Sequence, residues 1–349
     1  TGSWGQELVS QLLPYKPRKI IIYSRGEHKQ VEMKRKFREF DQMNYIIGDV
    51  RDRDRLLQIT QGVDIIFHLA ALKHVPICEE NPSESVATNI TGTQNVIDAA
   101  IINKVKRVID VSTDKAVDPF NIYGTCKAVA EKLIIAANAQ TNETDFVCVR
   151  GGNVLGTNGS VVPLFIEQIK KANTVTLTDP NMTRFIMSLK QAIGLLITAS
   201  VEARGGEVIV MNMPGVTVDV IAETMIRAYG NQMTNKAIIG SRPGEKKHEL
   251  LVSQYESERT YLLGEKYFVI LPMIDTQRDY SAYYSLPSFS HVYFGSNNTN
   301  LLSVEEFYAI LEKDGWINSV FPKDSLQELE TLSKEELISY FTQQGWMKK

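Results

Sequence analysis

The sequence has few cysteines and no long apolar run. Only three of its 349 residues are cysteine, namely Cys78, Cys126 and Cys148. Their odd number and unpaired spacing argue against a disulfide scaffold or a zinc site, so we expect a reducing, cytoplasmic setting. No apolar run reaches the roughly 18 residues that a membrane helix needs, and no signal-peptide pattern is present. We therefore expect a soluble protein without a membrane span.

An excess of charge of one sign is also absent. The 38 basic and 41 acidic residues leave a net charge of −3, and the basic residues are dispersed. This distribution argues against a nucleic-acid-binding surface. With 43% hydrophobic residues, the chain can bury one large core or two modest ones.

Short β-branched runs alternate with helical patterns through the first half of the chain. Strands are predicted at residues 19–23, 44–50, 63–69, 108–113 and 145–150. This alternation predicts an α/β fold with a Rossmann-like, doubly wound parallel sheet. The pattern loosens after Thr157, which predicts a smaller α/β domain. We assign residues 1–155 and about 185–212 to the sheet domain, about 156–184 and 213–300 to the smaller domain, and 301–349 to a C-terminal helical segment.

The most informative stretch runs from Val111 to Lys127. Tyr123 and Lys127 are one helical turn apart and share a face. A lysine beside a phenol favours the phenolate and lowers the pKa of the tyrosine, so the pair is a candidate base. Thr113, Asp114 and Lys115 precede them at the end of a predicted strand, where doubly wound sheets bind their ligands. Asp114 and Lys115 could instead form a structural ion pair.

Two further stretches favour a dinucleotide. The glycines in Thr1-Gly2-Ser3-Trp4-Gly5 are spaced like the second half of G-x-x-G-x-x-G, whose backbone N–H groups bind a pyrophosphate. The strand and first glycine that should come before them are absent, so either the first strand is missing or these glycines are a flexible start. Ser24, Arg25 and Lys29 follow the next strand and favour NADP over NAD, because an arginine there accommodates a 2′-phosphate. The alternative is a solvated basic loop.

The sequence T-D-K-A followed by N-x-Y-G-x-x-K resembles the extended short-chain dehydrogenase/reductase superfamily. Within it, the chain is most similar to the inverting UDP-N-acetylglucosamine 4,6-dehydratases of the polysaccharide biosynthesis protein family. Further matching segments lie at residues 72–82, 88–93, 151–163, 178–185, 241–246 and 293–306, so the resemblance spans roughly residues 1–315. The family usually has an aromatic residue where Gly151 stands, which changes the expected shape of the pocket.

The resemblance implies a set of binding residues. Those that hold the cofactor would be Thr1, Gly2, Ser3, Trp4, Gly5, Ser24, Arg25, Lys29, Asp49, Val50, Leu69, Ala70, Ala71, Lys73, Asn89, Tyr123 and Lys127. Those that hold the UDP-sugar would be Lys73, His74, Asn153, Ser160, Val161, Arg184, Arg242 and Glu245. The two arginines would bind the diphosphate, because guanidinium groups recognise phosphate in a bidentate manner. His68, inside an apolar strand, is expected to be a core histidine with a hydrogen-bond partner.

The resemblance also implies the reaction. Tyr123, helped by Lys127 and Thr113, would take the proton of the C4 hydroxyl as hydride passes to NADP+. Lys115, with its pKa lowered by burial and by Lys127, would remove H5. Asp114, kept protonated, would donate to the departing C6 hydroxyl. Hydride would return to C6 and a proton to the opposite face of C5, so NADP would be regenerated and stay bound.

Two alternatives stay open: a related UDP-sugar epimerase or 5,6-ene reductase that performs part of this cycle, and a non-catalytic nucleotide-sugar-binding protein. The family also implies a homo-oligomer, a dimer or hexamer, and a product used for pseudaminic acid or other surface glycans. Leu326, Leu329 and Leu332 predict an amphipathic appendage in the C-terminal segment that serves packing or an oligomer contact.

Overall fold

A computed structural model of the chain describes residues 1–156, 160–240 and 244–317. Arg242 and the predicted appendage lie outside these ranges. The central six-stranded sheet has the order β13-β14-β9-β5-β4-β3. Its parallel strands are β3 (Ile65–His68), β4 (Arg107–Thr113), β5 (Asp145–Gly151) and β9 (Val208–Met211), and its antiparallel strands are β14 (Tyr267–Ile270) and β13 (Thr260–Leu263). The Rossmann-like fold class is confirmed.

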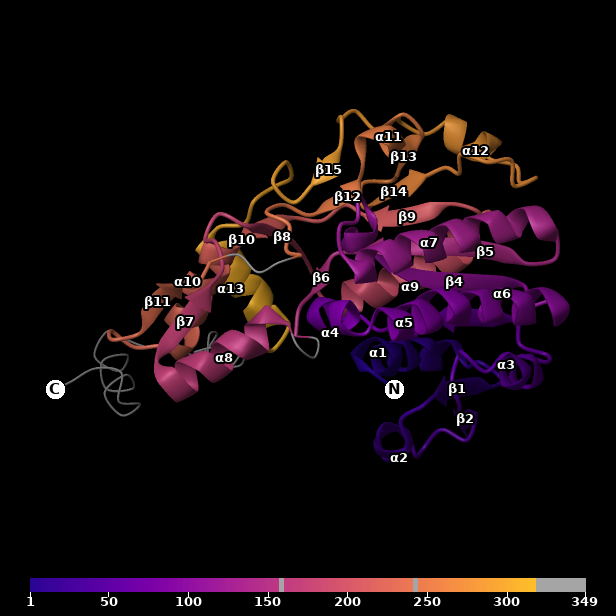
Figure 1. Cartoon of the computed structure of the whole chain (residues 1–349), viewed down its shortest axis with the longest axis horizontal. Helices are drawn as coiled ribbons and strands as arrows, with labels where there is room; N and C mark the ends of the chain where they lie inside the picture. Colours follow the sequence, from indigo (N-terminus) through magenta and orange to yellow (C-terminus); the bar gives the residue numbers. More distant parts are fainter. Residues whose placement is uncertain (157–159, 241–243, 318–349) are drawn as a thin grey trace, which may run out of the picture.

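The middle strands are apolar because both faces of the sheet are covered. Val108, Ile109 and Phe146 are fully buried, as expected for a parallel sheet between helical layers. Helices α6 (Gly92–Ile102) and α7 (Ile122–Ala137) cover one face, and α1 (Ser3–Leu12) and α9 (Leu189–Glu202) cover the other (Figure 1). Strands β1 (Ile20–Ser24) and β2 (Met43–Ile47) pair in parallel with each other in a separate sheet. The shorter helices of this half are α2 (Glu27–Lys36), α3 (Arg53–Ile59), α4 (Val75–Glu80) and α5 (Pro82–Val86).

A second hydrophobic core forms beside the sheet, in the lobe at the left of Figure 1. Phe165, Leu177, Met225 and Phe307 are among its buried members. It is built by α8 (Val161–Ala172), α10 (Val218–Tyr229), α13 (Val304–Lys313), β7 (Thr174–Leu177), β11 (Asn235–Ile238), β8 (Thr183–Met187), β10 (Gly215–Thr217) and β6 (Asn153–Val154). The amphipathic pattern of α8, with apolar residues at helical spacing, places one side of the helix in this core.

The predicted domain boundaries need two corrections. Residues 260–270 were assigned to the smaller domain, but β13 and β14 pair with the main sheet through β9. Helix α13 was assigned to a separate C-terminal segment, but its residues Phe307 and Leu311 belong to the second core. Long-range pairing and packing decide both points, and neither leaves a local signal. The connecting elements near this edge are β12 (Leu250–Val252), α11 (Gln254–Ser257), α12 (Ser281–Tyr284) and β15 (Phe294–Gly295).

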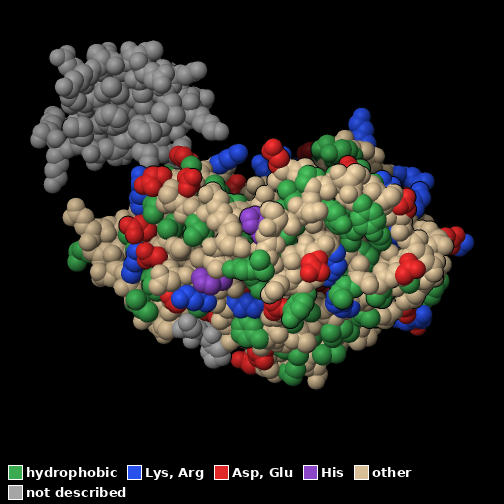
Figure 2. Space-filling view, turned by 90° about the horizontal axis from the view of Figure 1, so that it is seen from above, with side chains coloured by type: hydrophobic (Ala, Val, Ile, Leu, Met, Phe, Trp, Pro, Cys, Tyr) green, Lys and Arg blue, Asp and Glu red, His purple; other side chains and the backbone are tan. Residues whose placement is uncertain are grey.

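The surface carries mixed charge where it can be seen in Figure 2. Acidic and basic side chains lie side by side over this face, with apolar side chains between them. Within the described ranges, no helix combines the length and the apolar composition required to cross a bilayer.

A buried ion-pair network joins the end of the sheet to the second half of the chain. Arg150 donates to Glu131 Oε2 at 2.7 Å and to Glu256 Oε1 at 2.8 Å, and its Nη1 also reaches the Leu251 carbonyl at 2.9 Å. Both Arg150 and Glu131 are only 3% exposed. Buried charges of this kind are tolerated only when each is paired, so loss of one partner is strongly destabilising.

This network makes stability depend on pH. Burial alone would raise the pKa of Glu256, but the charge and hydrogen bonds of Arg150 outweigh it and lower the pKa to about 2 from its ordinary 4.5. A lowered pKa means that Glu256 contributes its full stabilisation above about pH 4.5 and loses it as the pH falls toward 2. We expect Glu256→Gln to cost about 3 kcal/mol of unfolding free energy at pH 7, and the gap to wild type to shrink below pH 4.5. Urea denaturation at several pH values, with exposed Glu258→Gln as control, measures this; a gap of constant size would contradict it.

Candidate active site

The five predicted catalytic residues come together at the carboxyl end of β4. The strand ends at Thr113, and a short 3₁₀ helix, Asp114–Ala116, follows directly. Asn121 then caps α7 by accepting from the Gly124 backbone N–H at 2.8 Å. This cap fixes the start of the helix, so Tyr123 and Lys127 lie one turn apart on its buried face.

Tyr123 lies among two lysines and the Thr113 hydroxyl. Burial raises the pKa of Tyr123, while Lys127, Lys115 and a hydrogen bond with Thr113 lower it, and the net shift is upward. The predicted lowering of the Tyr123 pKa by Lys127 is therefore present, but burial outweighs it. For the protein without ligands, the prediction of a lowered net pKa is wrong. A phenol kept protonated in this state can act as a base only when further positive charge or hydrogen bonding reaches it.

Lys127 has a buried ion-pair partner, Asp110, that was not predicted from the sequence. Its Nζ lies 3.2 Å from Asp110 Oδ2, and both side chains are almost fully buried. Asp110 is also 4.0 Å from His68 Nε2, which is 3.1 Å from the Thr93 hydroxyl. Burial lowers the pKa of His68 to about 4, so this ring is neutral and the expected core histidine is confirmed. A charged residue inside the apolar run Val108–Val111 was the signal that a buried partner was required.

Lys115 lies between two carboxyl groups. Its Nζ is 3.0 Å from Asp114 Oδ1 and 3.5 Å from Glu249 Oε1. Burial alone would lower the pKa of Lys115, but Asp114 and Glu249 outweigh it and raise the pKa. The predicted lowering of the Lys115 pKa by burial and Lys127 is therefore wrong for this state, because two carboxyl groups, the neighbouring Asp114 and the distant Glu249, face the ammonium.

Residues from the second half of the chain cover Lys115. Glu249 is anchored by its backbone, since its N–H donates to Ser296 Oγ at 3.0 Å and its carbonyl accepts from the Ser296 N–H at 2.9 Å. Lys246 Nζ donates to the Val117 carbonyl, directly after the 3₁₀ helix. Asn121 Nδ2 reaches the Gly244 carbonyl at 3.3 Å. Residues 244–249 therefore form a wall of the site, whereas the sequence predicted a role only for Glu245 of this stretch, in substrate binding.

Several predicted substrate residues carry buried polar atoms that have no hydrogen-bond partner among the residues that the structure describes. Asn153 Oδ1, Ser160 Oγ and Glu245 Oε2 are buried in this way, as are Asp114 Oδ2 and Glu249 Oε2. Because a buried polar atom without a partner is costly, such groups suit a polar ligand that supplies the missing hydrogen bonds.

The remaining predicted substrate residues differ in exposure. Arg184 is mostly buried, donates to the Thr183 carbonyl at 2.7 Å and lies 4.0 Å from Glu249. His74 caps α4 and is exposed, and Val161 opens α8. Lys73 is close enough to Lys115 that the two ammonium groups repel, and burial with this repulsion lowers the pKa of Lys73. This position fits its predicted contact with cofactor or substrate.

Some of the predicted dinucleotide residues lie at the start of α1 and in the loop after β3. Gly2 precedes α1 with open space around it, so its backbone and the first N–H groups of the helix are accessible. Gly5 allows α1 to approach Leu69, which lies 3.8 Å from the position of an added Cβ. Asn89 holds the loop after Ala70 and Ala71 through two hydrogen bonds with the Leu72 backbone, at 2.8 and 2.9 Å. These features fit a dinucleotide.

The residues predicted to bind a 2′-phosphate, Ser24, Arg25 and Lys29, lie between the end of β1 and the first turn of α2. Arg25 and Lys29 are exposed next to Ser24, at the N-terminus of α2. Asp49 pairs mainly with Arg51 at 2.7 Å, whereas Arg25 is 3.8 Å from it. Arg25 is therefore accessible for an anionic ligand. Val50 follows β2 and lies against the start of α6, since a Cβ added at Gly92 would be 2.7 Å from Val50 Cγ2.

Gly151, where the resemblance implies an aromatic residue, is covered by another aromatic ring. A Cβ added at Gly151 would be 3.5 Å from Trp4 Cη2 and 3.7 Å from Met187 Sδ. A larger side chain there would collide with the indole of Trp4. The ring of Trp4 therefore fills part of the space beside the end of β5 that an aromatic side chain at position 151 would otherwise occupy.

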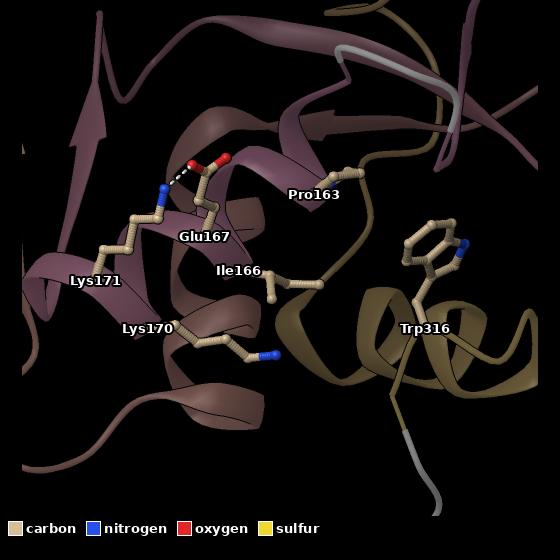
Figure 3. Close-up of a pocket in the computed structure, with 6 residues that line it drawn as sticks. All are labelled: Pro163, Ile166, Glu167, Lys170, Lys171 and Trp316. Atoms are coloured by element: carbon tan, nitrogen blue, oxygen red, sulfur yellow. Dashed lines mark hydrogen bonds and ion pairs between the residues drawn. The ribbon is translucent and has the colours of Figure 1, made fainter.

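A separate surface hollow lies on the second lobe. Figure 3 shows the indole of Trp316 facing Pro163 and Ile166 of α8, with the Lys171–Glu167 ion pair of 2.6 Å on the far side. The residues that line this hollow are Pro163, Ile166, Glu167, Lys170, Lys171 and Trp316, and none of them is a predicted catalytic or binding residue.

Comparison with known proteins identifies the family to which this chain belongs. Residues 1–271 match the polysaccharide biosynthesis protein family. A UDP-N-acetylglucosamine 4,6-dehydratase (inverting) from Campylobacter jejuni is 44% identical over 80% of this chain and 84% of its own length. A UDP-glucose 4-epimerase from Rickettsia felis is 39% identical over 89% and 93%. The X-ray structure of Pen from Bacillus thuringiensis is 37% identical, covers 91% of this chain and 96% of its own, and has a TM-score of 0.84.

Proposed function

Because the chain belongs to the polysaccharide biosynthesis protein family, we propose that it is a UDP-N-acetylglucosamine 4,6-dehydratase that inverts C5 and uses bound NADP. The product would be a UDP-4-keto-6-deoxy-2-acetamido sugar for surface-glycan synthesis. The observation that carries the proposal is the Asp114–Lys115 pair beside Tyr123. Simple oxidation and reduction at C4 needs only Tyr123 and Lys127, whereas loss of water across C5 and C6 also needs an acid and a base at that end of the sugar.

Each residue has a task that its position supports. Tyr123 takes the proton of the C4 hydroxyl, helped by the Thr113 hydroxyl and the charge of Lys127. Lys115 removes H5 from the resulting ketone and later returns a proton to C5. Asp114, whose Oδ2 has no protein partner, donates a proton to the departing C6 hydroxyl. When bound, the nicotinamide accepts hydride from C4 and returns it to C6.

Substrate and cofactor selectivity would rest on the surrounding groups. Asn153, Ser160 and Glu245 offer buried polar atoms to the nucleotide sugar, and Arg184 would bind its diphosphate. Arg25, with Lys29 and Ser24, would bind the 2′-phosphate of NADP.

The cofactor assignment predicts a selective loss of affinity. We expect Arg25→Gln to weaken NADP+ binding about tenfold, because a charge-assisted hydrogen bond contributes about 1.5 kcal/mol, and to leave NAD+ binding within about threefold. Calorimetric titration of cofactor-free protein measures both affinities. Arg35→Gln, on the exposed side of α2, is the matched control. An equal loss for both cofactors, or tighter NAD+ than NADP+ binding by the wild type, would contradict the assignment.

A second candidate is a UDP-sugar 4-epimerase, which the name of the Rickettsia felis relative favours. The two activities differ in the mass of the product, since dehydration removes one water and epimerisation removes none. Mass spectrometry after incubation with UDP-N-acetylglucosamine and with UDP-glucose separates them. Loss of water from the first substrate supports the dehydratase, and a chromatographically distinct product of unchanged mass from either substrate supports the epimerase.

A further inference from the structure

The structure contains a third ionisable group at the dehydration centre, which the family resemblance did not supply. Glu249 is only 3% exposed and points one carboxylate oxygen, Oε1, at Lys115 Nζ at 3.5 Å. Its other oxygen, Oε2, is buried without a protein partner. Lys115 is thus held between Glu249 on one side and Asp114 on the other.

Lys115 cannot serve as a base in this arrangement without first losing a proton. It carries an ammonium between two carboxyl groups, and the pairing favours its charged form. A base is needed only after the ketone forms at C4, so the proton must leave Nζ within the closed site. Of the two flanking groups, Asp114 already has the role of donor to the C6 hydroxyl, which leaves Glu249 as acceptor.

The surroundings of Glu249 favour such an exchange. Burial and the neighbouring Asp114 raise the pKa of Glu249, while Lys115, Arg184 and Lys246 lower it, with a net upward shift. With its pKa raised, Glu249 holds an added proton more readily than an exposed carboxylate would. Both backbone hydrogen bonds to Ser296 keep the carboxylate in place without engaging its oxygens.

On the basis of the proposed dehydratase function, we propose that Glu249 is a positioning residue that takes a proton from Lys115 and so converts it to the amine that removes H5. An N–H bond of Lys115 breaks and an O–H bond forms on Glu249. The amine then takes H5, the C5–C6 double bond forms, and the hydroxyl leaves as water with the proton of Asp114. After Lys115 returns its proton to C5, Glu249 gives the stored proton back to Nζ. Asp114 regains a proton from Tyr123, which took it from the C4 hydroxyl, through the Thr113 hydroxyl that bonds to both side chains.

The test separates the first hydride transfer from the elimination. Glu249→Gln keeps the shape of the side chain but cannot accept the proton. We expect reduced cofactor to form at a rate within about threefold of wild type, whereas exchange of H5 with solvent deuterium falls about 100-fold at pH 7, within the range for general acid–base steps. The exchange should recover as the pH rises, because hydroxide then removes the Lys115 proton; a purely structural role would not produce this recovery.

Control variants distinguish a proton-accepting role of Glu249 from a purely structural one. Glu258→Gln removes an exposed carboxylate nearby and should behave as wild type. The proposal would be overturned if Glu249→Gln exchanged H5 at a rate within threefold of wild type at pH 7. It would also be overturned if the loss of H5 exchange were of equal size at every pH. If that variant does not fold, as judged by circular dichroism, Glu249→Asp decides: slowed exchange with intact hydride transfer supports the proposal, and equal slowing of both overturns it. A wild type that never forms the ketone would instead refute the proposed function on which the inference rests.

Discussion

Lys115→Ala should still bind NADP and oxidise C4, but should lose exchange of H5 with solvent deuterium by at least about 1,000-fold, as expected for removal of the base. The ketone forms through Tyr123 and Lys127, which this substitution leaves in place. The C5 proton then has no acceptor, so reduced cofactor accumulates. Proton NMR in deuterated water, together with the absorbance of the reduced nicotinamide, measures both steps in one sample.

The alanine variant also leaves two buried carboxyl groups facing each other, because both Asp114 and Glu249 pair with Lys115. Lys115→Met, which fills the same space without a charge, is therefore the matched variant. Both substitutions should give the same kinetic pattern. Continued H5 exchange in either would exclude Lys115 as the base.

Tyr123→Phe should block the reaction one step earlier. Without the phenol no group takes the proton of the C4 hydroxyl, so we expect formation of reduced cofactor to fall roughly 1,000-fold. The exchange of H5 should fall with it, because no ketone acidifies C5. Stopped-flow absorbance measures the first step, and NMR measures the exchange.

The oxidation state of the bound cofactor thus distinguishes the two variants. Lys115→Ala accumulates the reduced form, and Tyr123→Phe does not produce it. Tyr45→Phe, in β2 and away from the catalytic residues, is the control for loss of a phenol. Reduced cofactor at the wild-type rate in Tyr123→Phe would show that another group takes the C4 proton.

Much of the fold was predictable because its signals are local. The predicted strands at residues 19–23, 44–50, 63–69 and 145–150 correspond to β1, β2, β3 and β5, within a few residues at each end. The one-turn spacing of Tyr123 and Lys127 predicted that they share a helix face, and both lie on the buried face of α7. Apolar runs, helix caps and one-turn spacings depend on neighbouring residues, so the sequence alone carries them.

The electrostatics of the site could not be predicted in the same way. Asp114, the sequence neighbour, and then Glu249 raise the pKa of Lys115, and Glu249 reaches Lys115 only through the folding of residues 244–249 over the end of β4. The role of Trp4 beside Gly151 likewise depends on how α1 packs against β5. Asp110 is different: a charge within an apolar strand was visible in the sequence and indicated a buried partner, which is Lys127.

The most direct test of the account is incubation with UDP-N-acetylglucosamine in deuterated water, without added cofactor, followed by NMR of the product. We predict a 4-keto-6-deoxy sugar that carries deuterium at C5 and shows the coupling of the inverted centre. Its formation without added cofactor would also show that the bound nicotinamide cofactor is retained and recycled. A C4 epimer without deuterium at C5, or no turnover even when NADP+ is supplied, would contradict it.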